Sequence, residues 1–226
     1  MDGNKITFIV DNGKIVGATI GGTDYKDFYK ANIQSTDKPS FDSVTFNTGG
    51  KQVGLRYSDF GTYTISRFGF NADGNPNQFQ EKIADNVPFA GGYASQRIES
   101  DKITKDLHFN GRAIGTARDE NDIVVLNDTA RLDFDAKNGQ NTLTANFRNW
   151  YDVVVRSDGT ITFDDYFGNG KVRFGEDTEY NKTGAKMNIG FYGEKPDTGI
   201  PSEATGTVQF RDTDTNIKMD IAFGAK

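Results

Sequence analysis

The side chains that could carry chemistry are few, and the first is a single histidine. His108, in the segment KDLHFNG, is the only imidazole among 226 residues, and the chain has no cysteine. A serine enzyme needs a histidine together with a nucleophile motif such as GxSxG, which the sequence lacks. His108 is therefore a candidate metal ligand, and the alternative is an unreactive histidine on the surface.

Tyrosines and arginines occur close together in two segments of the first half of the chain. Tyr57 and Tyr63 lie near Arg56, and Tyr93 lies near Arg97. Aromatic walls combined with arginines suit a flat apolar ligand that has anionic groups. The alternative for each of these residues is ordinary packing of strand aromatics beside exposed arginines.

Other possible ligands fit structural roles better. The acidic pairs at 164–165 and 212–214 do not match the spacing of an EF-hand loop, and carboxylates at hairpin ends are commonly solvated. Met187 and Met219 fall in expected strands, where we predict that they pack in a core. No set of residues supports catalysis, so we do not expect an enzyme.

The composition indicates a chain of many short strands. It contains 26 Gly, 18 Phe and 9 Tyr but 5 Pro and 1 Trp, and the mean hydropathy is −0.63. Its net charge of −6 argues against a surface that follows nucleic acid phosphates. No apolar run reaches membrane-span length, and no signal peptide precedes MDGNK. We expect a cytoplasmic protein or a mature form whose leader has been removed.

Alternating apolar and polar residues predict strands in the first hundred residues. The one helical candidate is the segment 77–86, where Phe79 and Ile83 would share a face. The predicted strands cover residues 5–10, 14–20, 43–48, 54–60 and 62–70.

The second half has more regular hairpins. Asn138-Gly139 and Asp158-Gly159 each separate two alternating runs, which is a strong hairpin signal. A third pair, 186–193 with 204–212, is joined by a loop with prolines and acidic residues. The last strand, 216–226, is expected to pair with the first strand of this half, 109–117, and so close a barrel.

These patterns predict an all-β protein with two parts. Residues 1–105 are expected to form a β-rich subdomain, and residues 106–226 an antiparallel β-barrel of roughly eight strands. The boundary near residue 105 marks the change from irregular strands to evenly spaced hairpins. We expect the span from 106 to 226 to fold without the first part.

Four segments together resemble the transferrin-binding protein B and hemophilin superfamily of Gram-negative surface and secreted proteins. They are LRYSDFGTYT (55–64), VPFAGGYASQRI (87–98), FNGRAIGTA (109–117) and GFYGEKPDTGIPSEATGTVQF (190–210). The resemblance implies an N-terminal "handle", a C-terminal barrel and export from the cell. Members of the superfamily capture host iron proteins, haemoglobin, complement regulators or haem, and the fold alone does not choose among them.

The length of the chain allows one handle-and-barrel lobe, which brings it closer to the hemophilin-like and factor-H-binding-like branches. The resemblance then implies a secreted hemophore, a monomer that captures haem, directly or from a host haem protein, and passes it to an outer-membrane haem receptor. His108 would be the axial ligand of the haem iron, because imidazole is the commonest protein donor and no cysteine competes. The residues expected to bind haem are His108, Tyr57, Tyr63, Tyr93, Arg56 and Arg97.

A second hypothesis from a different class stays open. The chain could be a surface or secreted module, anchored by lipid or not, that captures a host protein without a cofactor. Exposed aromatic loops of the handle would then bind the partner, and His108 would be incidental.

Overall fold

The computed structural model describes the chain except for residues 1–5, 12–13, 21–22, 27–36, 44–45, 49–50, 71–75, 119–122, 148–150, 165–181, 184 and 214–215. The regular elements of the described residues are strands, with three short 3-10 helices between them. The predicted all-β class is therefore confirmed. Within these residues no helix has the length and apolarity that crossing a membrane requires.

The chain divides into two compact units. Unit 1 comprises residues 1–42 and 62–87, and unit 2 comprises residues 43–61 and 88–226. The sequence predicted a domain boundary near residue 105, with residues 106–226 able to fold alone. A division by contacts does not test whether a part folds alone. The boundary stays a prediction.

The first strands of the chain form small antiparallel sheets. One sheet has the order β1–β2–β3, a second has the order β4–β7–β8, and β5 pairs with β6 alone. Their bounds are Ile6–Asp11 for β1, Lys14–Ile20 for β2, Thr23–Lys26 for β3, Asp37–Ser43 for β4, Phe46–Thr48 for β5, Lys51–Val53 for β6, Ser58–Phe70 for β7 and Pro76–Gly92 for β8.

Two predictions for this part of the chain are wrong. The expected helix at 77–86 lies inside strand β8, which pairs with β7. A ten-residue helix with two apolar positions has little to bury, whereas pairing with β7 satisfies backbone groups along the whole segment. The strands expected at 54–60 and 62–70 are one strand that begins at Ser58, and residues 54–57 form a loop.

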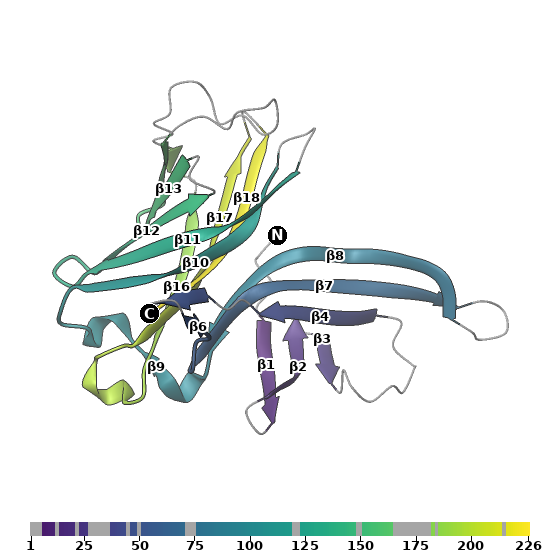
Figure 1. Ribbon diagram of the computed structural model, residues 1–226, viewed down its shortest axis with the longest axis horizontal. Coiled ribbons are helices and arrows are strands. Elements are labelled where there is room, and N and C mark those ends of the chain that lie inside the picture. The colour runs from purple at the N-terminus through teal and green to yellow at the C-terminus, as the bar shows by residue number, and fades with distance from the viewer. Residues whose placement is uncertain are drawn as a thin grey trace. The chain divides into compact units, whose positions relative to one another are not determined.

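Unit 2 contains a ten-stranded sheet that curls around its buried face (Figure 1). Its order is β15-β14-β13-β12-β11-β10-β18-β17-β16-β9. Eight longer strands and two strands of two residues agree with the predicted barrel of roughly eight strands. The strands are β9 (Arg97–Ile98), β10 (Leu107–Arg118), β11 (Ile123–Asp135), β12 (Gln140–Phe147), β13 (Tyr151–Arg156), β14 (Thr160–Asp164), β15 (Lys182–Thr183), β16 (Lys186–Tyr192), β17 (Glu203–Asp212) and β18 (Ile217–Ala225).

The predicted hairpins of this sheet are confirmed. Gly139 and Gly159 have φ angles of 64° and 90°, which the turns between β11 and β12 and between β13 and β14 require. β18 pairs with β10 along eight residues, from Gly111↔Ala225 to Arg118↔Lys218. The sheet's outermost strands are β15 and β9, so this pair lies at the middle of the sheet and not at a closing seam.

The core of unit 2 fills the inside of the curled sheet. Alternate residues of every long strand point inward, as Leu132, Phe134 and Phe223 do, all less than 3% exposed. Ile98 of β9 and Ile103 join the same cluster from outside the hairpins. The segment that precedes β10 therefore contributes to the core.

A matched pair of isoleucines tests whether β9 belongs to this core. Ile98 is 2% exposed and Ile200 is 69% exposed. We expect Ile98→Ala to lower the free energy of unfolding by about 2–4 kcal/mol, because it leaves a cavity. Ile200→Ala is expected to change it by less than about 0.5 kcal/mol. Urea denaturation of both variants measures the difference, and equal effects would contradict the placement of Ile98.

Candidate functional site

A buried carboxylate joins two distant segments of unit 2. Glu203, the first residue of β17, is 3% exposed. Its oxygens accept hydrogen bonds from the backbone N–H groups of Arg56 and Tyr57 and from the Ser58 hydroxyl. The last two bonds are 2.9 and 3.0 Å long. A buried charge is stable only when it is bonded in this way, so residues 56–58 are held to one conformation.

The segment held by Glu203 fixes a second loop through the backbone. The Tyr93 N–H donates to the Tyr57 carbonyl at 2.9 Å, and the Tyr93 carbonyl accepts from the Gln96 N–H at 2.9 Å. The Arg56 guanidinium lies 5.1 Å from the centre of the Tyr57 ring, within the range of a cation–π contact. Three of the predicted site residues, Arg56, Tyr57 and Tyr93, are therefore brought together.

The loop between β16 and β17 packs against the same region. The Gly193 N–H donates to the Gln96 carbonyl at 3.0 Å, and the Ser202 N–H donates to the Tyr192 carbonyl at 2.9 Å. Gly199 has a φ of 66°, and a Cβ there would lie 2.2 Å from the Lys102 carbonyl oxygen. Residues 93–102 and 193–202, which include η1 (Ala94–Gln96), η2 (Ser100–Lys102) and η3 (Pro196–Thr198), are called the loop pair below.

The loop pair holds two apolar side chains in solvent. Ile200 is 69% exposed and Tyr93 is 38% exposed, although the backbone at both positions is fixed by its neighbours. Arg97 is also exposed, and its Nε lies 3.7 Å from a Glu99 carboxylate oxygen. The surface of the loop pair therefore presents apolar and charged side chains on a backbone that hydrogen bonds hold in place.

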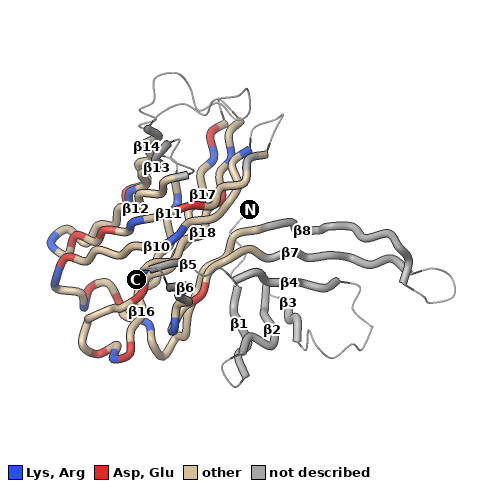
Figure 2. Tube along the Cα trace, viewed as in Figure 1, with Lys and Arg blue, Asp and Glu red and all other residues tan. Residues whose placement is uncertain are grey.

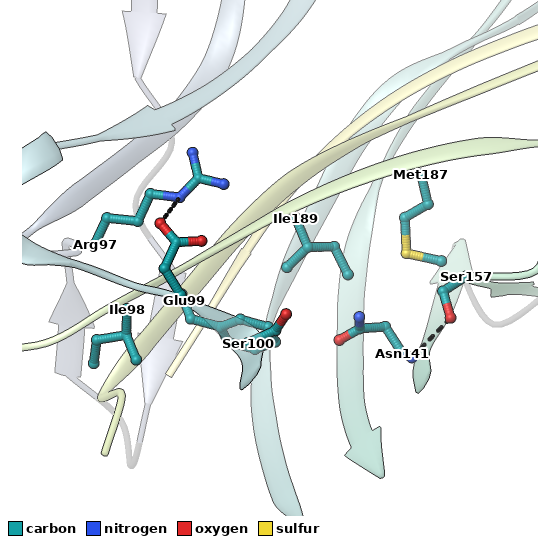
Figure 3. A pocket seen from close by; sticks show the side chains of 9 residues that line it. Arg97, Ile98, Glu99, Ser100, Asn141, Ser157, Met187 and Ile189 are labelled. Atoms are coloured by element: carbon teal, nitrogen blue, oxygen red, sulfur yellow. Dashed lines mark hydrogen bonds and ion pairs between the residues drawn. The ribbon is translucent and has the colours of Figure 1, made fainter. Parts of the chain in front are cut away.

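Two cavities adjoin strand β16, and Arg97 lines both. The smaller cavity, of about 120 Å³, is shown in Figure 3. The larger, of about 480 Å³, lies over the outer face of β16 and β17, where Tyr192 forms part of its wall. Burial raises the pKa of the Tyr192 hydroxyl above its ordinary value, so this wall stays uncharged.

Asn141, one of the residues that line the smaller cavity, carries an unsatisfied polar atom. Asn141 Oδ1 is buried and has no hydrogen-bond partner among the described residues. The backbone N–H of Asn141 donates to the Ser157 hydroxyl at 3.1 Å (Figure 3).

His108 lies elsewhere, on the outer face of β10. It points away from Phe109, as the alternation of the strand predicted, and its side chain is 63% exposed. Its Nδ1 is 2.5 Å from Asp133 Oδ1 on β11, and the Arg131 Nε donates to the same oxygen at 2.9 Å. One ring nitrogen is therefore engaged by a carboxylate on an open strand face.

The described residues around His108 do not fit a haem. They place the imidazole in an exposed row of polar side chains, and neither of the two cavities described above includes it. Within the same residues no group of three or more possible metal ligands occurs. The side chain of Tyr63, in β7, lies outside the described residues. Haem ligation by His108 stays a prediction.

Three residues that matter in the structure had no role assigned from the sequence. Glu203 lies in one of the segments that carry the family resemblance, but the alternation of apolar and polar residues in that segment did not predict that its side chain would be buried. Ile200 and Asn141 gave no signal, because exposure in a loop and an unsatisfied amide depend on long-range packing.

The chain matches no family model and no curated protein. Solved structures similar to it include two crystal structures of mutants of the vaccine antigen transferrin-binding protein B from Haemophilus parasuis Hp5, and intact Ap-TbpB with its N and C lobes. Their TM-scores are 0.49, 0.47 and 0.48, at 16%, 17% and 18% identity. The alignments cover 96%, 96% and 93% of this chain but 41% of each of those chains. The chain thus spans about two fifths of their length.

Replacing the Glu203 carboxylate tests its role. Glu203→Gln keeps the shape but turns an NH₂ group toward donors, so we expect a loss of about 2–4 kcal/mol of unfolding free energy. Ser58→Ala removes one donor only and should cost about 1 kcal/mol. Urea denaturation measures both. A Glu203→Gln variant as stable as the parent chain would show that the carboxylate does not hold the loop.

Proposed function

We propose that this chain is a capture module, secreted or on the cell surface, that binds a partner protein through the loop pair and needs no cofactor for it. The observation that supports this most directly is Ile200. Its side chain is 69% exposed, yet it stands between Gly199, in the left-handed conformation, and the buried Pro201.

Fixed backbone makes such a side chain an effective anchor. Binding through a mobile loop costs conformational entropy, whereas the loop pair is already ordered by backbone hydrogen bonds before a partner arrives. A branched apolar side chain on this support can enter a pocket on the partner with little further ordering.

The residue types of the loop pair and of residues 56–58, which it contacts, suit a protein interface. Tyr93, Arg56 and Arg97 are of the residue types enriched in protein interfaces, where an apolar contact is combined with polar groups. Acidic and basic residues are interspersed along the loop pair and the strands of unit 2 (Figure 2). A mixed surface of this kind favours a protein partner over a phosphate backbone.

The family resemblance supplies the partners to test. They are host iron-carrying proteins such as transferrin and haemoglobin, and complement regulators. The rival ligand is haem alone. His108 supports it less well, because its side chain is exposed and the larger cavity does not include it.

Binding of the full chain to immobilised transferrin, haemoglobin and complement regulators tests the proposal. We expect one of them to bind, and Ile200→Asp to weaken that binding at least about tenfold, since a charge would enter an apolar pocket. The control is Val125→Asp on β11, where the parent side chain is 61% exposed and lies outside the loop pair. That variant should bind like the parent chain, and biolayer interferometry measures all three.

Two results would contradict the proposal. One is binding that Ile200→Asp and Val125→Asp affect equally. The other is a haem titration of the parent chain that reaches a stoichiometric endpoint, with a Soret band that changes in His108→Ala, while no protein of the panel binds. The second result would establish haem capture in its place.

A further inference from the structure

Strand β16 has one open stretch in its edge. On one side it pairs with β17 along its whole length, from Lys186↔Gln209 to Tyr192↔Glu203. On the other side it pairs with β9 only at Phe191 and Tyr192. Residues 186–190 therefore have no strand partner on that side among the described residues, and this stretch is called the edge gap below.

The backbone groups that face the edge gap can be identified from the bonds at its two ends. The Ala185 N–H donates to the Gly159 carbonyl at 3.2 Å, and the Gly193 N–H donates to the Gln96 carbonyl at 3.0 Å. Alternate residues of a strand direct their N–H and C=O groups to the same side. Met187 and Ile189 therefore present their backbone donors and acceptors to the edge gap.

A cavity lies on each face of the sheet beside the edge gap, and the two share Arg97, Met187 and Ile189 in their walls. The inner cavity, of about 120 Å³, is lined also by Asn141 and Ser157 (Figure 3). The outer cavity, of about 480 Å³, is lined by polar side chains that include Asn188 and Thr207.

We infer that the edge gap binds a short extended segment of the captured protein, which adds to the sheet as a strand beside β16. Alternate side chains of such a strand point to opposite faces, so they would enter the two cavities in turn. This inference rests on the proposed function, because it assigns a second contact to the same partner protein.

The two cavities define the chemistry of the segment. The inner cavity takes a small side chain, such as that of serine or threonine, because its volume is small. The outer cavity takes an acidic or amide side chain, because Arg97 and Asn188 supply donors. The segment therefore alternates small residues with acidic or amide residues.

Amide hydrogen exchange of the full chain, followed by NMR, tests whether the edge gap is open. The amides of Met187 and Ile189 should exchange at least about a hundredfold faster than those of Asn188 and Gly190, which face β17. Equal protection of all four amides would overturn the inference, because the edge would already be covered.

A synthetic heptapeptide that alternates threonine and glutamate, blocked at both ends, tests binding. Saturating peptide should slow exchange of the Met187 and Ile189 amides at least about tenfold. A peptide of the same composition, with four threonines followed by three glutamates, should have no effect. N-methylation at the positions that face β16 should abolish binding, whereas methylation at the intervening positions should not.

Ile189→Pro supplies the matching change in the protein. It removes a donor that faces the edge gap and none that faces β17, so the fold should be retained while peptide binding falls at least about tenfold. Peptide that binds this variant equally, or no binding of the alternating peptide to the parent chain, would overturn the inference.

The outcomes separate this inference from the proposed function. If a host protein binds through Ile200 while the peptide leaves the Met187 and Ile189 amides unchanged, the capture module stands and the strand site is wrong. If the peptide binds but no protein of the panel does, the strand site stands and the proposed capture is wrong.

Discussion

The carboxylate of Glu203 is buried at a cost in solvation that its hydrogen bonds to residues 56–58 must offset. These bonds join positions 145 to 147 residues apart. From there a series of backbone contacts continues through Tyr57, Tyr93 and Gln96 to Gly193. Each link fixes the next, so the rigidity of the loop pair depends on the first. Under the proposed function, the exposed Ile200 anchors a partner only while that rigidity is maintained.

Local signals in the sequence predicted the hairpins of unit 2 well. The turns depend on the φ preferences of two short segments, Asn138-Gly139 and Asp158-Gly159, which act within four residues. The outward direction of His108 likewise follows from strand alternation. Prediction failed where the result depends on distant residues. The segment 77–86 is a strand because β7 lies beside it, and residues 54–57 leave the strand conformation where Glu203 binds the adjacent backbone.

The candidate site shows the same division between local and long-range information. The structure brings together Arg56, Tyr57 and Tyr93, which the sequence motifs had grouped, and the hydrogen bond between Tyr57 and Tyr93 joins backbone atoms. The pairing of His108 with Asp133 depends on the register of β10 against β11. The edge gap could not be predicted from the sequence either. It exists because β9 is too short to pair with the whole of β16, and alternation does not reveal which strands are neighbours. The contacts that form the candidate site therefore depend on strand pairing, which alternation alone does not encode.

The position of β18 between β10 and β17 has a consequence for how the chain folds during synthesis. β10 to β14 can form hairpins as they leave the ribosome, because each pairs with the strand made just before it. β16 and β17 can pair in the same way, and among the described residues the short β15 joins them to β14 through the pair Thr160↔Thr183, whereas β18 pairs along its length with both β10 and β17. Pairings of high sequence separation, such as Gly111 with Ala225, form late because loop closure costs entropy before contacts compensate for it. The nine residues of β18 therefore complete the middle of the sheet, because they pair with β10 on one side and with β17 on the other.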